Sequence, residues 1–158
     1  DNTISVFEKM GVLSARELHA RYEIELENYV KKLQIESRVI SDLALNHIVS
    51  TVVKYQFKLA QTARSLTELD MLVEAEPIKE IIRDISSHVV VIKKLVHEMT
   101  EARKTANNLE DSLEKATYYG SVVKGYFEGI RYHVDKLELL IDDEDWPLAK
   151  YREMLFME

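Results

Sequence analysis

The sequence predicts an all-α fold, in which an antiparallel bundle of three long helices at about residues 14–73, 77–106 and 108–142 is followed by an irregular aromatic C-terminal tail. Loops and hairpins need Gly and Pro, yet only four Gly and two Pro occur in 158 residues. Apolar residues also recur at three- and four-residue spacing over long stretches, which is the period of one helix face. Short turns between such helices favour antiparallel neighbours.

The first helix is predicted to begin after Ser14, because Glu17 stands three residues later, as in a capping box. No Gly or Pro interrupts residues 14–76. An apolar stripe runs along this stretch through Tyr22, Leu26, Tyr29, Leu33, Val39, Ile40, Leu43, Ile48, Val52, Tyr55, Leu59, Ala63, Leu66 and Leu69. A bend near residues 34–36 is one possibility, since a helix of this length is unusual in a globular domain.

Glu36 falls where the stripe calls for an apolar residue. In one interpretation the stripe rolls over Ile35 and Val39 and leaves Glu36 at its edge. In the other, Glu36 is buried and paired with a cation, because an unpaired buried carboxylate is very costly. The sequence leaves both open.

A break is predicted at residues 74–77, with Pro77 in the first turn of the second helix, where its missing N–H costs nothing. A turn at residues 105–108 then leads to the third helix, whose stripe contains Gly120, Gly125 and Gly129. These glycines indicate either close contact between helices or a kink.

Residues 142–145 are four consecutive carboxylates, and negative charge at a helix C-terminus opposes the helix dipole, so the third helix is expected to end there as a solvated terminator. The tail that follows contains Trp146, Tyr151, Leu155 and Phe156. Leaving these side chains in water would be costly, so the tail is expected to pack on the helices or on a partner.

Composition narrows the function classes. The net charge of −7 argues against a nucleic-acid or anionic-membrane surface, and no apolar run approaches the length of a membrane helix. There are no cysteines, which excludes disulfides and thiol chemistry and is typical of a cytoplasmic protein. The chain does not begin with Met, so it is expected to be a fragment or a trimmed chain.

No catalytic, cofactor-binding or metal site is predicted. Helical bundles bind metals through Glu-x-x-His pairs, and the sequence contains none; it also lacks phosphate-loop and nucleophile-elbow motifs. Arg131 and Asp135 are four residues apart on the third helix. They form either an exposed ion pair of small effect or a buried pair that orients the helix against a neighbour.

Two groups of residues resemble a known family. Near the front these are Gly11-Val12-Leu13-Ser14, Glu17-Leu18, Arg21-Tyr22-Glu23, Glu27-x-Tyr29-Val30 and Ile35-Glu36. Near the end they are Tyr118-Tyr119, Ile130-Arg131, Asp135, Leu137-Glu138 and Trp146-Pro147-x-x-x-Tyr151-x-x-x-Leu155-Phe156. Together they resemble the C-terminal domain of type III glutamine synthetases. The chain departs from the family at Ala149, where a second Pro is common, which makes the tail backbone less rigid.

The resemblance implies a non-catalytic helical domain, residues 14–158, that serves subunit packing or assembly, with residues 1–13 as a lead-in from a catalytic domain not present in this chain. The parent protein would be an ATP-dependent glutamate–ammonia ligase that uses Mg or Mn, whereas this chain would hold no cofactor. Its expected partners are that catalytic domain and neighbouring subunits of a homo-oligomer. The residues expected to make such interactions are Glu36, Arg131, Asp135, Trp146, Tyr151, Leu155 and Phe156.

Two other readings remain open at this stage. A free-standing helical interaction module would have the same composition and would use the tail to grip a partner. A helical enzyme or metal protein would need a constellation that only the folded structure could assemble.

Overall fold

The computed structural model describes residues 2–155, and the side chains of all of these except Asn2, Tyr151 and Arg152. Every regular element in this part of the chain is helical, which confirms the predicted all-α class. The elements are α1 (Asn2–Lys9), α2 (Ala15–Asp42), the π-helix η1 (Leu43–Val49), α3 (Ser50–Glu68), α4 (Leu72–Asn107), α5 (Ser112–Tyr118), the π-helix η2 (Tyr119–Val123), α6 (Gly125–Leu140) and α7 (Tyr151–Met154).

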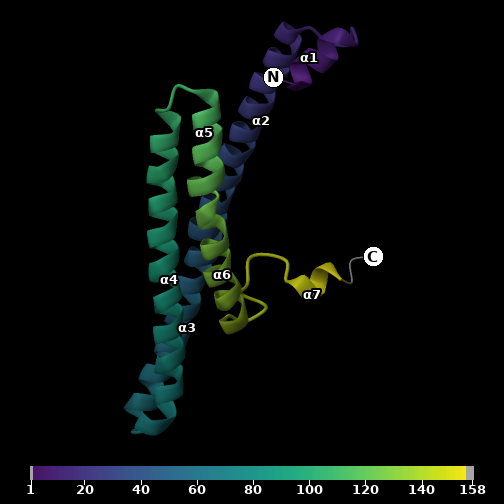
Figure 1. The fold of residues 1–158 in the computed structure, drawn as a ribbon. Helices are drawn as coiled ribbons and strands as arrows, with labels where there is room; N and C mark the ends of the chain where they lie inside the picture. The colour runs from purple at the N-terminus through teal and green to yellow at the C-terminus, as the bar shows by residue number, and fades with distance from the viewer. Residues whose placement is uncertain (1, 156–158) are drawn as a thin grey trace.

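The first long helix runs without a break from α2 through η1 into α3 (Figure 1). Its irregular segment is η1, not the bend considered at residues 34–36. The inward-facing positions Ile40, Ala44, Ile48 and Val52 are spaced by four residues, and each such step over-rotates an α-helix by about 40°. The wider π turn absorbs this drift and keeps the four side chains on one face. Tyr119, Val123 and Phe127 repeat the same spacing across η2.

The turn between α3 and α4 lies earlier than predicted, at residues 69–71. The amides of Asp70 and Met71 donate to the carbonyls of Thr67 and Leu66 at 3.1 and 2.9 Å, and Asp70 has a positive φ of 63°. This is a Schellman cap, with Asp in the position that Gly usually takes. Helix α4 therefore begins at Leu72, and Pro77 lies in its second turn rather than its first.

The third helical arm, formed by α5, η2 and α6, begins at Ser112. The side chain of the preceding Asp111 caps it by accepting a hydrogen bond from the Glu114 amide at 2.7 Å. The arm ends at Leu140, just before the carboxylate run, as the helix dipole predicts.

Two of the three glycines in this arm lie at close helix contacts. A Cβ on Gly120 would stand 2.7 Å from the Tyr29 hydroxyl oxygen, and one on Gly129 would stand 3.2 Å from Leu95 Cδ1. Gly125 has open space around it.

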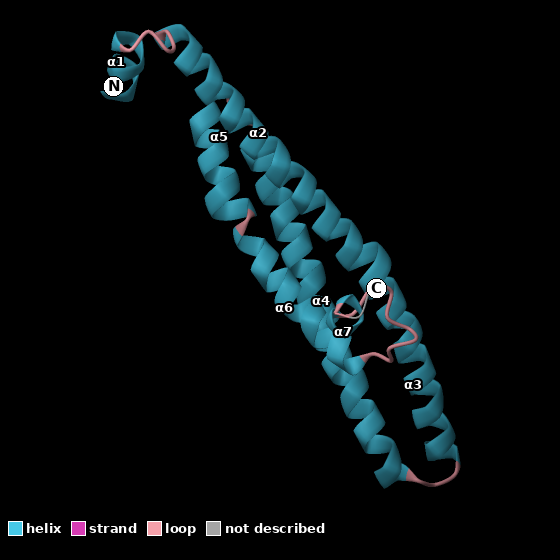
Figure 2. Ribbon diagram, turned by 90° about the vertical axis from the view of Figure 1, so that its right-hand side faces the viewer, coloured by secondary structure: helices cyan, strands magenta, loops and turns pink. Residues whose placement is uncertain are grey.

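Packing partners change along the molecule. Helix α4 packs against α3 over its first half and against α6 farther on, whereas α2 packs mainly against α5. The α2–η1–α3 helix and α4 therefore diverge. Helix α1 and the first turns of α2 project beyond the rest of the molecule (Figures 1 and 2). This arrangement departs from a regular bundle in which three helices pack along their full length.

The main core gathers around α4. Its completely buried side chains include Val52, Ile85, Ile92, Met99, Tyr119, Val123 and Leu137. The Tyr119 hydroxyl donates to Asn107 Oδ1 at 2.7 Å, and Gln34 Nε2 donates to the same oxygen at 2.9 Å. One amide thus connects α2, α4 and η2.

The N-terminal end is held by local contacts. Ser14 and Glu17 form the predicted capping box, in which the Ser14 amide donates to Glu17 Oε2 at 2.8 Å and the Glu17 amide donates to Ser14 Oγ at 3.3 Å. The segment expected as a lead-in contains the short helix α1. The division into residues 1–13 and 14–158 stays a prediction.

Candidate functional site

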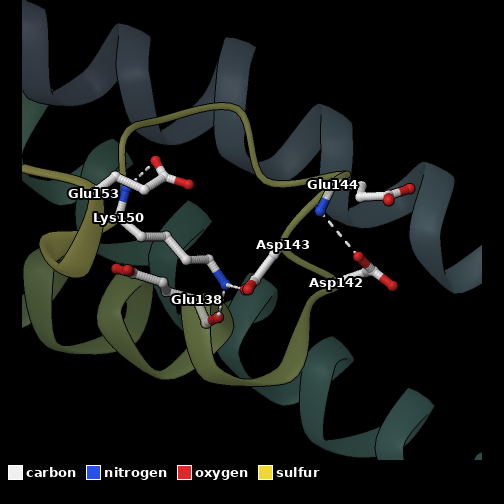
Figure 3. A network of polar contacts seen from close by, with 6 residues as sticks. All are labelled: Glu138, Asp142, Asp143, Glu144, Lys150 and Glu153. Atoms are coloured by element: carbon white, nitrogen blue, oxygen red, sulfur yellow. Dashed lines mark hydrogen bonds and ion pairs between the residues drawn. The ribbon is translucent and has the colours of Figure 1, made fainter. Parts of the chain in front are cut away.

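The tail turns back immediately after α6. Ile141 adopts an extended backbone, and the amides of Asp145 and Trp146 both donate to the Asp142 carbonyl at 3.1 Å. The Glu144 amide donates to Asp142 Oδ1 at 2.9 Å (Figure 3). This tight turn directs the Trp146 side chain into the core, where only 8% of it is exposed. Trp146 thus packs on the helices of this chain, which is one of the two alternatives that the sequence left open.

Two lysines fasten the turn. Lys58 on α3 donates to both carboxylate oxygens of Asp145, at 2.8 and 2.7 Å, and this hydrogen bond raises the pKa of Lys58. The side chain of Lys150 is largely buried; its Nζ contacts Asp143, donates to the Glu138 carbonyl at 3.1 Å, and lies 6.0 Å from the centre of the Trp146 ring (Figure 3). The carboxylate run is therefore more than a solvated terminator, because Asp143 and Asp145 anchor the tail.

Beyond this anchor the tail leaves the helices. The Lys150 amide donates to Glu153 Oε2 at 3.0 Å at the start of α7, which extends away from the bundle (Figure 1). Leu155, a predicted contact residue, is 64% exposed. Tyr151 lies in α7, but its side chain is outside the described set, and Phe156 lies outside the described residues altogether.

An apolar groove of about 470 Å³ opens beside the anchored tail. It lies between the end of α2 and η1 on one side and α6 on the other, and Leu148 of the tail contributes to its lining. Its apolar lining is Ile40, Leu43, Ala44, Ile48, Phe127, Ile130, Val134 and Leu148, with Glu128 and Arg131 as its charged members. The π-helix η1 supplies most of one wall. Local widening of a helix thus shapes this site.

The remaining predicted residues lie around the groove or away from it. Arg131 and Asp135 form the exposed alternative, with Nε and Oδ2 3.7 Å apart and both side chains mostly in solvent. Glu36 is half-buried, yet it forms no ion pair with another described residue. The stripe does not roll over Ile35 and Val39, which are exposed; it passes through Leu33 and the fully buried Ser37. The Ser37 hydroxyl donates a hydrogen bond to the Gln34 carbonyl at 3.0 Å, and this bond is why a buried polar residue is tolerated there.

Sequence reasoning missed the residues that anchor the tail and one contact between α4 and α6. Lys58 is 87 positions from Asp145 in the sequence. His88 is 45 positions from His133, yet the Nδ1 atoms of the two histidines lie 2.8 Å apart. No local pattern carries such pairings, because they depend on which helices become neighbours. The Lys150 contacts could have been suspected, because Lys150 is the first cation after the carboxylate run.

The groove itself is mainly apolar, with Glu128 and Arg131 as its charged members. Within residues 2–155, no group of three or more His, Cys, Asp or Glu side chains is placed to hold a metal ion. The titratable groups whose pKa departs from its ordinary value are spread over the molecule rather than gathered at the groove: Glu17, Lys58, Glu76, Arg83, Glu101 and His133. Most are surface groups paired with a neighbour, such as Glu76, whose pKa is lowered by the hydrogen bond from Arg83. None of the described helices is long and apolar enough to cross a membrane.

Comparison with known proteins places the chain. Residues 1–67 match the family described as the glutamine synthetase C-terminal domain. A glutamine synthetase of Bacteroides fragilis is 50% identical over 149 residues, which cover 92% of this chain and 20% of that protein. A glutamine synthetase of Butyrivibrio fibrisolvens and the type-3 glutamine synthetase of Dictyostelium discoideum are each 26% identical over 99% of the chain and 22% of their own length.

The chain thus spans about a fifth of the length of the curated relatives it matches. The sequence motifs lie near the two ends of the chain, and the alignments with the relatives cover its middle as well. The resemblance seen in those motifs is confirmed: the chain is similar to the glutamine synthetase C-terminal domain over residues 1–67 and to glutamine synthetases, a type-3 enzyme among them, over nearly its whole length.

Proposed function

We propose that this chain is a non-catalytic helical domain of a glutamine synthetase and that it serves subunit packing or assembly. The observation that carries the proposal is the apolar groove between η1 and α6, which lies open beside the anchored tail. Apolar surface of this kind costs free energy while it faces water and is typical of sites that bind other protein surfaces. The exposed apolar side chains of Met154 and Leu155 on the projecting end of the tail support the same role.

The chemistry of the parent protein is proposed to lie outside this chain. Its relatives are named glutamine synthetases, so the parent would join glutamate and ammonia with ATP as the energy source and Mg or Mn as the metal. The groove is lined mainly by aliphatic side chains and has one carboxylate, Glu128, in its lining, whereas such metals take several oxygen ligands. The proposed partners of the groove and tail are the catalytic domain of the same protein and neighbouring subunits.

A first test concerns catalysis. The purified 158-residue chain is incubated with glutamate, ammonia, ATP and either Mg or Mn, and glutamine is measured by chromatography. We expect no glutamine above the level of a protein-free blank. Glutamine formation by this chain alone would contradict the proposal.

A second test concerns assembly. The chain replaces the matching segment of the Bacteroides fragilis relative, which is 50% identical to it, and the mass of the chimera is measured by size-exclusion chromatography with light scattering. Ile40→Asp places a carboxylate in the groove, whereas Val39→Asp makes the same kind of change on the adjacent, exposed position of the same helix. We expect the first variant to shift the chimera to smaller species and the second to leave it assembled.

Circular dichroism of both variants checks that each stays helical. Equal assembly of the Ile40→Asp and Val39→Asp chimeras would remove the groove from the proposed interface. A chimera that assembles equally well when the whole segment is deleted would remove the chain from assembly altogether.

A further inference from the structure

Two histidines on different helices face each other where α4 packs against α6. His88 of α4 and His133 of α6 are both half-buried, and their Nδ1 atoms lie 2.8 Å apart, with ring centres 5.1 Å apart and planes tilted by 54°. Gly129 lies one turn before His133, where its missing side chain lets α6 approach Leu95 of α4. The close approach of the helices therefore brings the two rings into hydrogen-bond distance.

The number of protons on the pair decides whether this contact can exist. With both rings neutral, one Nδ1 carries a proton and donates to the lone pair of the other. With one extra proton, an imidazolium donates to a neutral imidazole, which gives a charge-assisted hydrogen bond. With two extra protons, both Nδ1 atoms carry hydrogens that point at each other. The hydrogen bond is then lost, and two positive charges lie side by side.

The surroundings offer little to neutralise a second charge. The pKa of His133 is lowered, first by burial and then by the charge of His88. The Tyr132 and His133 rings stand perpendicular to each other with centres 5.2 Å apart, and the Lys136 ammonium lies 5.4 Å from the centre of the tyrosine ring. Arg131 and Asp135 pair with each other. Asp84 on α4 is the other titratable side chain within one turn of the pair. Helix α3 also packs on α4 and carries Lys54 and Tyr55 among its titratable side chains, and none of the described contacts joins these three residues to either histidine ring.

We propose that His88 and His133 form an acid-sensitive contact between α4 and α6, which holds the helices together while the pair carries at most one extra proton. A second proton separates the rings and loosens the packing of α6 on α4. The inference goes beyond the role in assembly and does not depend on it, because it concerns only the internal contact of two helices.

The direct test is a titration of the histidine side chains of the 158-residue chain by nitrogen-15 NMR from pH 8 to pH 4.5. We expect His88 and His133 to titrate as a coupled pair in two steps. The second step should lie at lower pH than the first, because it breaks the hydrogen bond between the two Nδ1 atoms. Titration of both rings in one shared step would overturn the proposal.

A second measurement follows the melting temperature between pH 7.5 and pH 5.5. Because the folded pair resists its second proton, the unfolded chain binds more protons as the pH falls, and the folded state loses stability on the acid side. The loss should be about 3–5 °C for each pH unit by which the second protonation is suppressed. His133→Gln should flatten this dependence, whereas His97→Gln, on an exposed position of α4, should leave it unchanged.

An acid-side loss that is as steep in His133→Gln as in the unaltered chain would overturn the proposal. If His133→Gln does not fold, the NMR titration of the unaltered chain decides alone.

Discussion

Helix α4 and the first half of α2 differ in how much of their apolar stripe is buried. Helix α4 buries seven side chains: Ala75, Ile85, Ile92, Val96, Met99, Ala102 and Ala106. The first half of α2, up to Tyr29, carries an equally regular apolar stripe and buries none of its described side chains completely. The difference is the number of neighbouring helices, because α4 lies against α3 and α6 while α2 projects beyond the rest (Figure 2).

An apolar stripe therefore shows which face of a helix can be buried, and the neighbouring helices determine whether that face is buried. Tyr22 and Ile24 are about half exposed on α2, as is Val12 just before it, so this end offers apolar surface that nothing in residues 2–155 covers. Local features, chiefly the capping box at Ser14, hold the helix there in place of packing.

The largest expected effect is in the core of α4. Ile92→Ala removes three methyl or methylene groups from a side chain with no exposed surface and should lower the free energy of unfolding by about 2–5 kcal/mol. Tyr22→Ala on α2 should change it by no more than about 0.5 kcal/mol, since that side chain is half exposed. Urea unfolding followed by circular dichroism measures both. Similar losses in the two variants would show that the projecting end is packed in solution.

A smaller effect is expected where α2, α4 and η2 meet. Tyr119→Phe removes a fully buried hydroxyl that donates to Asn107 Oδ1 at 2.7 Å and should cost about 1 kcal/mol. The cost is limited because Asn107 keeps its hydrogen bond from Gln34. Tyr132→Phe, at an exposed position, is the matched control in the same urea experiment. A Tyr119→Phe variant as stable as the control would mean that the hydroxyl exchanges with water.

The smallest effect on global stability is expected at the start of α2. Ser14→Ala removes the capping box, so amide exchange over residues 15–19 should speed up while the urea midpoint barely moves. The pKa of Glu17 is lowered from its ordinary 4.5, chiefly by the hydrogen bond from the Ser14 amide. A lowered carboxylate pKa gives stability that is complete above pH 4.5 and is lost as the pH falls through the lower folded value. The unaltered chain should therefore fray here first in acid, and Ser14→Ala should lose much of that pH dependence. Unchanged exchange in the variant would show that α1 fixes this end instead.

The helical elements could be predicted because their causes are local. Few glycines, regular stripes, the Ser14–Glu17 box and the carboxylates after Leu140 each act within a few residues, and they placed most helix ends to within a few positions. One helix limit was predicted wrongly, and its cause is also local. The turn at Asp70 precedes the predicted one because Pro77, in the second turn of a helix, removes only one backbone hydrogen bond.

The candidate site was predicted only in part, and the reason is again range. Trp146 was expected to be buried because a large aromatic side chain in water is costly, and it is buried. The groove was not foreseen, since it needs η1 and α6 to lie side by side. The sequence pattern does contain the four-residue spacing that calls for a π turn, at positions 40 to 52, but that spacing becomes meaningful only once these residues are known to share a face.

By itself, then, the sequence determined the all-α class, the approximate helix limits and the resemblance to the C-terminal domain of type III glutamine synthetases, because these rest on local propensity and short motifs. Tertiary structure alone decided which stripes are buried, that Lys58 and Lys150 fasten the tail, and that His88 meets His133. Such contacts join residues far apart in the chain, and only the packing of one helix on another brings them together.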